Sequence, residues 1–76
     1  MNITFTVKLF AYFRDNRFLK RECEYPEGIS VGDIVAGLDI DFDEVGVLMI
    51  NSRHCEFTSQ PKAGDNLAIF PKVGGG

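Results

Sequence analysis

The chain has 76 residues, a formal net charge of −3 and 45% hydrophobic residues. This length allows one domain, and the composition is typical of a globular protein rather than a disordered one. The eight basic residues are scattered, which argues against nucleic-acid binding, and no apolar run reaches the ~18–20 residues of a membrane span. The N-terminal end lacks the pattern of a signal peptide, so we expect a cytoplasmic protein.

Two strands are predicted in the first third of the chain. Residues 3–9 alternate apolar and polar side chains, which is typical of a strand with one buried face. Residues 10–14 break the alternation and predict a short helical turn. Residues 19–25 predict a second strand, of a length that suits antiparallel pairing with the first. Its inward-facing residues are predicted to be Leu19, Cys23 and Tyr25.

A helix is predicted after the turn at residues 26–28. Ser30 and Asp33 have the spacing of a short capping box, and Ile29 and Ile34 that of a hydrophobic staple. The next apolar residues recur at the spacing of one helix face, which we expect to pack against the sheet. They are Val31, Ile34, Val35 and Leu38.

The remaining strands are predicted in the second half of the chain. Residues 45–50 are almost wholly apolar, as in a central strand covered on both faces. Residues 54–57 predict a short strand and residues 67–70 the last one, which Pro71 stops because proline cannot donate to the ladder. This order predicts an α+β fold, the ubiquitin-like β-grasp roll, with a mixed sheet of four to five strands crossed by one main helix.

Three segments together resemble the ubiquitin-like sulfur carriers, which include the small subunit of molybdopterin synthase and the thiamine sulfur carrier. These segments are residues 30–34, 45–53 and 62–76, the last of which contains a Gly64-Asp65 turn and ends in Gly75-Gly76. The resemblance covers essentially the whole chain. It implies a domain over residues 1–71 and a flexible diglycine tail over residues 72–76.

The resemblance also implies a carrier rather than an enzyme. An E1-like adenylyltransferase would adenylate the carboxylate of Gly76, and a sulfur donor would convert it into a thiocarboxylate. The sulfur would then pass to a biosynthetic enzyme, such as the large subunit of a synthase. ATP would be consumed on the partner enzyme, and the chain itself would bind no cofactor.

The residues near the tail leave the sulfur pathway open. Phe70-Pro71 followed by Val73 is similar to the molybdopterin-synthase subunit, which we expect first. Lys72 stands where that group often has a second proline, and Gly74 is closer to the thiamine carriers. Thiamine thiazole synthesis is therefore an alternative. A protein modifier that forms isopeptide bonds, and an interaction module with an inert tail, are further alternatives.

The composition of the tail suits entry into another protein's ATP site. Residues 71–76 extend to at most ~20 Å, enough to enter a channel while the domain stays outside. Gly74, Gly75 and Gly76 lack a Cβ and would fit a narrow channel. Pro71 biases Phe70 away from helical angles, so the tail starts extended. Val73 is expected to be an anchor along the channel, and Gly75, Gly74, Pro71 and Phe70 are expected to contact the partner as well. Phe70 ends the last strand, so we expect it to lie in both the core and the interface.

Other chemistry-bearing residues have simpler interpretations. The acidic segment of residues 39–44 begins like a calcium loop but lacks the required glycine and the final glutamate, so no metal site is expected. Cys23 and Cys55 are expected to be free thiols. His54 and Cys55 are adjacent on a strand and would point to opposite faces, so they are not a catalytic pair.

An aromatic cluster comes directly after the first predicted strand. Its members are Phe10, Tyr12 and Phe13. Side chains of this size usually contribute to the core of a small domain. We therefore expect core packing rather than a docking surface, with a partner-facing patch as the alternative for some of the three.

Overall fold

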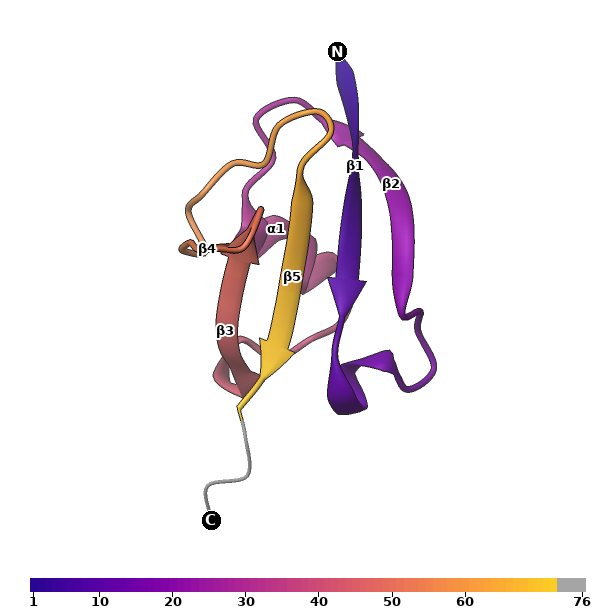
Figure 1. Ribbon diagram of the computed structural model, residues 1–76, viewed down its shortest axis with the longest axis vertical. Helices are drawn as coiled ribbons and strands as arrows, with labels where there is room; N and C mark the ends of the chain where they lie inside the picture. The colour runs from indigo at the N-terminus through magenta and orange to yellow at the C-terminus, as the bar shows by residue number, and fades with distance from the viewer. Residues whose placement is uncertain (73–76) are drawn as a thin grey trace.

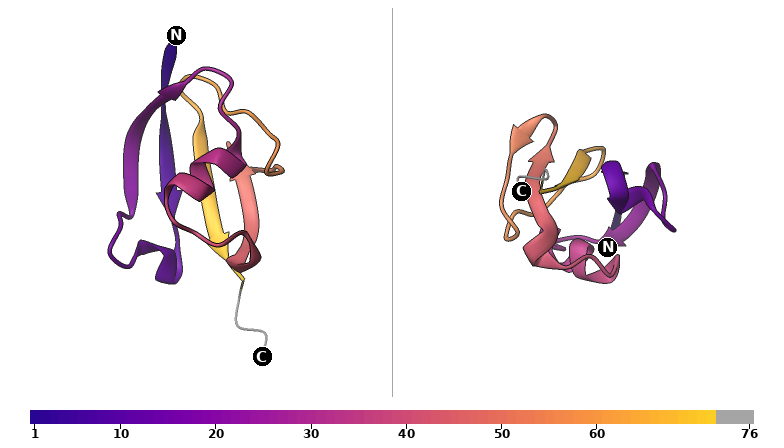
Figure 2. Two further views of the ribbon diagram at one scale, coloured as in Figure 1. Left: turned by 180° about the vertical axis from the view of Figure 1, so that it is seen from behind. Right: turned by 90° about the horizontal axis from the view of Figure 1, so that it is seen from below.

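The computed structural model describes residues 1–72. The elements, in chain order, are β1 (Asn2–Leu9), η1 (Ala11–Arg14), β2 (Lys20–Pro26), α1 (Val31–Gly37), η2 (Phe42–Glu44), β3 (Val45–Ile50), β4 (Arg53–His54) and β5 (Asn66–Pro71). In this part of the chain the strands form one five-stranded sheet in the order β2-β1-β5-β3-β4. Helix α1 lies across one face of the sheet (Figures 1 and 2). The predicted α+β, ubiquitin-like β-grasp roll is confirmed.

Strand β1 pairs antiparallel with β2 and parallel with β5. The alternation read from the sequence is confirmed, since Phe5, Val7 and Leu9 are buried beneath the helix. The prediction that Leu19 faces inward is wrong, because this residue precedes β2 at the outer edge of the sheet and its side chain is 55% exposed. Only its carbonyl is used, accepting a hydrogen bond from the Leu9 amide at 3.0 Å.

Helix α1 begins as predicted and ends sooner. The Asp33 amide donates to Ser30 Oγ at 3.1 Å, and the Ser30 amide donates to Asp33 Oδ2 at 3.5 Å, which confirms the capping box. Ile34 is fully buried. The last predicted residue of the apolar face, Leu38, is instead the C-cap and is only partly buried. Asp39 comes next with φ +59°, so the chain has already left the helix.

The prediction that residues 45–50 form the central strand is wrong. The central strand is β5, and β3 lies between β5 and the two-residue β4. Leu48 pairs with Ile69 on the helix side, whereas Met49 pairs with Ala68 on the other face. With one helix to cover one face, the apolar residues of β3 on the other face are left to solvent or to another protein.

Strand β4 is shorter than expected. It comprises only Arg53 and His54, and pairs with the end of β3. The predicted strand extends to residue 57, but β4 ends at His54, and of residues 55–57 only Cys55 still bonds to β3, its amide donating to the Leu48 carbonyl at 3.0 Å. The turn before β4 contains two residues with positive φ, Asn51 at +52° and Ser52 at +68°. Asn51 is tied to the start of β5, since its Nδ2 donates to Asp65 Oδ1 at 3.0 Å.

Candidate functional site

The end of β5 is where the predicted tail leaves the domain. Pro71 is buried and pairs with Val45 of β3. The amide of Lys72 donates to the carbonyl of Glu44 at 2.9 Å, so the chain is held against β3 one residue beyond the strand. The other predicted tail residues are Val73, Gly74, Gly75 and Gly76. They lie outside the described residues, so their roles and the boundary between residues 1–71 and 72–76 stay predictions.

Phe70, the last aromatic residue before this exit, lies on the face of the sheet that the helix does not cover. Its ring stacks on Phe10, with centroids 4.1 Å apart and planes 13° apart. Both side chains are half-buried. The guanidinium of Arg14 lies 5.5 Å from the centre of the Phe10 ring, and its Nε donates to the Leu9 carbonyl at 2.9 Å.

This pairing corrects the interpretation of the aromatic cluster after β1. Phe13 is buried in the core, as expected. Phe10 is on the open face and Tyr12 is 46% exposed, so the core assignment is wrong for both. Phe10 is extended backbone directly after the buried Leu9, so strand alternation turns its side chain to the open face. Tyr12 lies in the tight turn of η1, which points its side chains in different directions within four residues.

Five half-buried apolar side chains of the open face form a continuous surface, which we call the apolar patch. Its members are Phe10, Val47, Met49, Ala68 and Phe70. A hollow of about 400 Å³ runs over it, with Lys8 on one side and Asn51, Ser52 and Asn66 at the far end. The hollow exists because Ala68 is small and lies between larger neighbours. A protruding side chain of a partner would fit such a hollow.

The other half of the open face is polar. From the register of β1 with β2, the pairs on this face are Thr4 with Glu24, Thr6 with Glu22 and Lys8 with Lys20. Polar and charged side chains of this kind suit contact with water. The face of the sheet that the helix does not cover is therefore polar over β1 and β2 and apolar over β5 and β3. The tail leaves the domain from the end of β5, beside β3. This division makes the half next to the tail the candidate docking surface.

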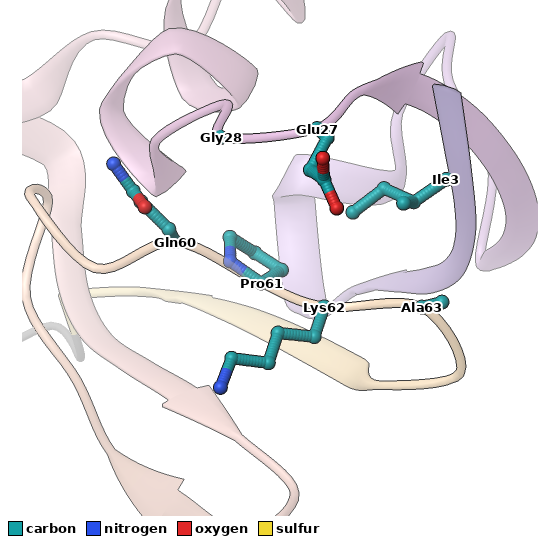
Figure 3. Close-up of a pocket in the computed structure, with 7 residues that line it drawn as sticks. All are labelled: Ile3, Glu27, Gly28, Gln60, Pro61, Lys62 and Ala63. Carbon is teal, nitrogen blue, oxygen red and sulfur yellow. The ribbon is translucent and has the colours of Figure 1, made fainter. Parts of the chain in front are cut away.

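A second hollow lies at the opposite end of the domain (Figure 3). It has a volume of about 400 Å³ and is lined by Ile3, Glu27, Gly28, Gln60, Pro61, Lys62 and Ala63. Figure 3 shows the Glu27 and Ile3 side chains close together, while Lys62 points away from them. The hollow lies beside the start of β5, so the length of that strand, about 20 Å, separates it from the tail exit. It takes no part in the candidate site.

The thiols are not organised for catalysis. Cys23 and Cys55 are both free and half-buried, and burial is the main cause that raises the pKa of each thiol. His54 is exposed while Cys55 packs against the core, so the two side chains diverge as predicted. Within residues 1–72, no three His, Cys, Asp or Glu side chains gather as metal ligands. No helix in the same range is long and apolar enough to cross a membrane.

The sequence interpretation missed most of the apolar patch. Val47 and Met49 were assigned to a strand covered on both faces, and Phe10 to the core. A usable signal was present: the sequence predicts one main helix, which covers one sheet face, yet residues 45–50 are apolar at nearly every position. The surplus of apolar side chains in that strand predicts a partner on the second face.

Comparisons with known proteins identify a matching family and several structures of similar fold. The family model of the ThiS family matches residues 7–76. A putative molybdopterin converting factor, subunit 1, from Pyrococcus furiosus is 28% identical, with a TM-score of 0.75 over 93% of this chain and 99% of that one. A comparison with curated proteins finds no match.

Two further structures are similar in fold. The small archaeal modifier protein 1 of H. volcanii is 22% identical, with a TM-score of 0.74 over 93% of this chain and 99% of that one. The ubiquitin of Caldiarchaeum subterraneum is 15% identical, with a TM-score of 0.65 over the full length of both chains. At these identities the likeness concerns the β-grasp fold alone.

Proposed function

The chain belongs to the ThiS family, and from this we propose that it is a sulfur carrier whose working group is the Gly76 carboxylate. An E1-like enzyme joins this carboxylate to the AMP moiety of ATP and releases pyrophosphate. Sulfur from a donor then displaces AMP and leaves a thiocarboxylate. The carrier delivers this sulfur to an enzyme that makes a molybdopterin-type cofactor.

The observation that carries the proposal is the continuity between the apolar patch and the base of the tail. Phe70 belongs to the patch, and Pro71 and Lys72 come directly after it. A partner bound to the patch would therefore receive the tail residues within its own surface. Extended, residues 71–76 span at most ~20 Å, a reach suited to a channel that leads to an ATP site.

The described residues also favour a carrier over an enzyme. The half-buried thiols have raised pKa values and stay protonated near neutral pH, so neither is an activated nucleophile. His54 is exposed and directed away from Cys55. The reactive groups for activation and sulfur transfer would then come from the partners: the adenylating enzyme, the sulfur donor and a large subunit or other acceptor.

The molybdopterin pathway is the first candidate for the sulfur. The Pyrococcus furiosus protein described as a molybdopterin converting factor subunit covers almost the whole chain at 28% identity. Phe70-Pro71 supports the same assignment. Thiamine thiazole synthesis is the second candidate, because the ThiS family model extends through Gly74, the residue that resembles thiamine carriers.

Reconstitution with a panel of E1-like enzymes tests the proposal. With ATP, we expect ATP–pyrophosphate exchange and an acyl-adenylate at Gly76. With a sulfur donor, intact-protein mass spectrometry should show a sulfur-for-oxygen exchange at the same carboxylate. If no enzyme of the panel forms an adenylate, the carrier and the modifier interpretations both fail. Lysine-linked conjugates without a sulfurated small-molecule product would favour the modifier.

A further inference from the structure

Gly46 lies in a β-bulge of β3, beside the point where β5 ends. The register of the two strands shifts between Val45 and Val47, which leaves Gly46 as the extra residue. A Cβ at Gly46 would lie 2.8 Å from the Pro71 carbonyl oxygen, 2.9 Å from Lys72 Cα and 3.0 Å from Lys72 N. All three are backbone atoms, so none can turn aside as the end of a side chain could.

The requirement for glycine at this position is one of space. The backbone of Gly46 does not adopt the left-handed φ values found at Gly28 and Gly64, which are +89° and +84°. Another residue could therefore adopt its conformation. Only glycine allows the two backbones to approach this closely, because even the methyl group of alanine would overlap the chain at residues 71–72.

The backbone that meets Gly46 is held from other sides as well. Pro71 is buried and pairs with Val45, and the Lys72 amide donates to the Glu44 carbonyl at 2.9 Å. Residues 44–46 thus fix the position and the direction of the last described residues before the tail. A methyl group at position 46 would push this segment away from β3, while the members of the apolar patch farther from the bulge, Phe10, Met49 and Ala68, stay in place.

We infer that Gly46 is a positioning residue for activation: its lack of a side chain sets the direction in which the chain leaves the domain toward Gly76. The inference rests on the proposed function, because direction matters only if the Gly76 carboxylate must reach an ATP site. Reacting groups tolerate little displacement, and a shift of about 1 Å costs on the order of 100-fold in rate.

The first test uses the free protein and needs no partner. In Gly46→Ala, the Lys72 amide should exchange with deuterium about tenfold faster, because its bond to the Glu44 carbonyl is opened. The matched control is Gly37→Ala, the same chemical change where the added Cβ has no neighbour within 4 Å. It should leave Lys72 exchange unchanged. Unchanged exchange in Gly46→Ala would overturn the inference.

The second test measures turnover in ATP–pyrophosphate exchange with an enzyme that accepts the parent chain. Gly46→Ala should lower kcat by about 100-fold with little change in KM, because docking through the patch is retained. Adding Lys72→Gly should restore part of kcat, since a glycine there lets the displaced backbone regain its direction. A thermal melt of each variant separates this restoration of kcat from a rescue of folding.

The outcomes separate the inference from the proposed function. Parental kcat in Gly46→Ala would overturn the inference and leave the carrier function standing. If the parent is inert with every enzyme, the proposed function fails, and the exchange measurement still decides whether Gly46 holds the Pro71–Lys72 segment. If Gly46→Ala fails to fold and Lys72→Gly does not rescue it, Gly46 acts through stability, which also overturns the inference.

Discussion

At the scale of single residues, Phe70 illustrates how strand alternation separates core from surface. Its neighbour Ile69 is fully buried, whereas Phe70 lies on the open face and stacks on Phe10. The sequence predicts that Phe70 lies in both the core and the interface. The structure places its ring in the apolar patch, next to the exit of the tail.

Replacing Phe70 with alanine should therefore impair docking more than folding. We expect a higher KM in ATP–pyrophosphate exchange and a modest loss of stability, of which the aromatic pair accounts for about 0.5–1.5 kcal/mol. Phe42→Ala is the matched control, because Phe42 stacks on Phe57 with centroids 4.5 Å apart and belongs to η2, outside the patch. It should leave KM unchanged. A loss above about 3 kcal/mol, typical of core aromatic residues, would place Phe70 in the core instead.

At the scale of elements, helix α1 shows that the residues that begin a helix are close together in the sequence, whereas those that end it need not be. The capping box involves only residues 30–33 and forms as predicted. The end of the helix depends on contacts beyond it, because the Leu38 carbonyl accepts a hydrogen bond from Arg17 Nε at 2.9 Å and Asp39 turns to positive φ. A contact with a residue 21 positions away cannot be read from helical spacing.

The shorter helix changes which alanine substitution should be most damaging. Ile34→Ala should cost about 2–5 kcal/mol, because it opens a cavity between the helix and the sheet. Leu38→Ala should cost clearly less, since Leu38 caps the helix and is only partly buried. Urea unfolding of both variants measures the difference. Equal losses would mean that Leu38 contributes to the core as the sequence pattern predicted.

At the scale of the whole molecule, the structure separates a folded domain from the residues expected to carry the chemistry. The core lies between α1 and one face of the sheet, and the apolar patch lies on the other face. The base of the tail is attached where β3 and β5 meet. Substitutions in the core should therefore lower the stability of the fold, whereas substitutions in the tail should lower activation at Gly76.

Removal of Gly76 should abolish activation while leaving stability within about ±0.5 kcal/mol of the parent, as for other sites away from the core. The deletion retracts the carboxylate by about 3.3–3.6 Å, and reacting atoms must approach to about 3–3.5 Å. Gly75→Val keeps the length but adds a branched side chain, and should have the same effect. ATP–pyrophosphate exchange beside a thermal melt measures both properties. Full activity of the deletion variant would contradict the proposed role of the tail.

Local features and the order of the elements could be predicted from the sequence alone, and that order already indicates the fold that the family resemblance implies. Alternation in β1 and the Ser30–Asp33 capping box are set by residues a few positions apart, so they need no knowledge of the rest of the chain. The resemblance also supplied the hypothesis for Gly75 and Gly76. These two residues remain a prediction of the sequence, because they lie outside the described part of the chain.

Only the folded chain reveals which strand is central, which aromatic side chains leave the core and where two backbones meet. β5 occupies the centre because it pairs with both β1 and β3, and the second face of β3 is open because α1 covers only the other face of the sheet. Gly46 touches the chain at Pro71 and Lys72, far away in the sequence. Such relations depend on long-range pairing, which brings together segments whose separate sequence patterns carry no information about each other.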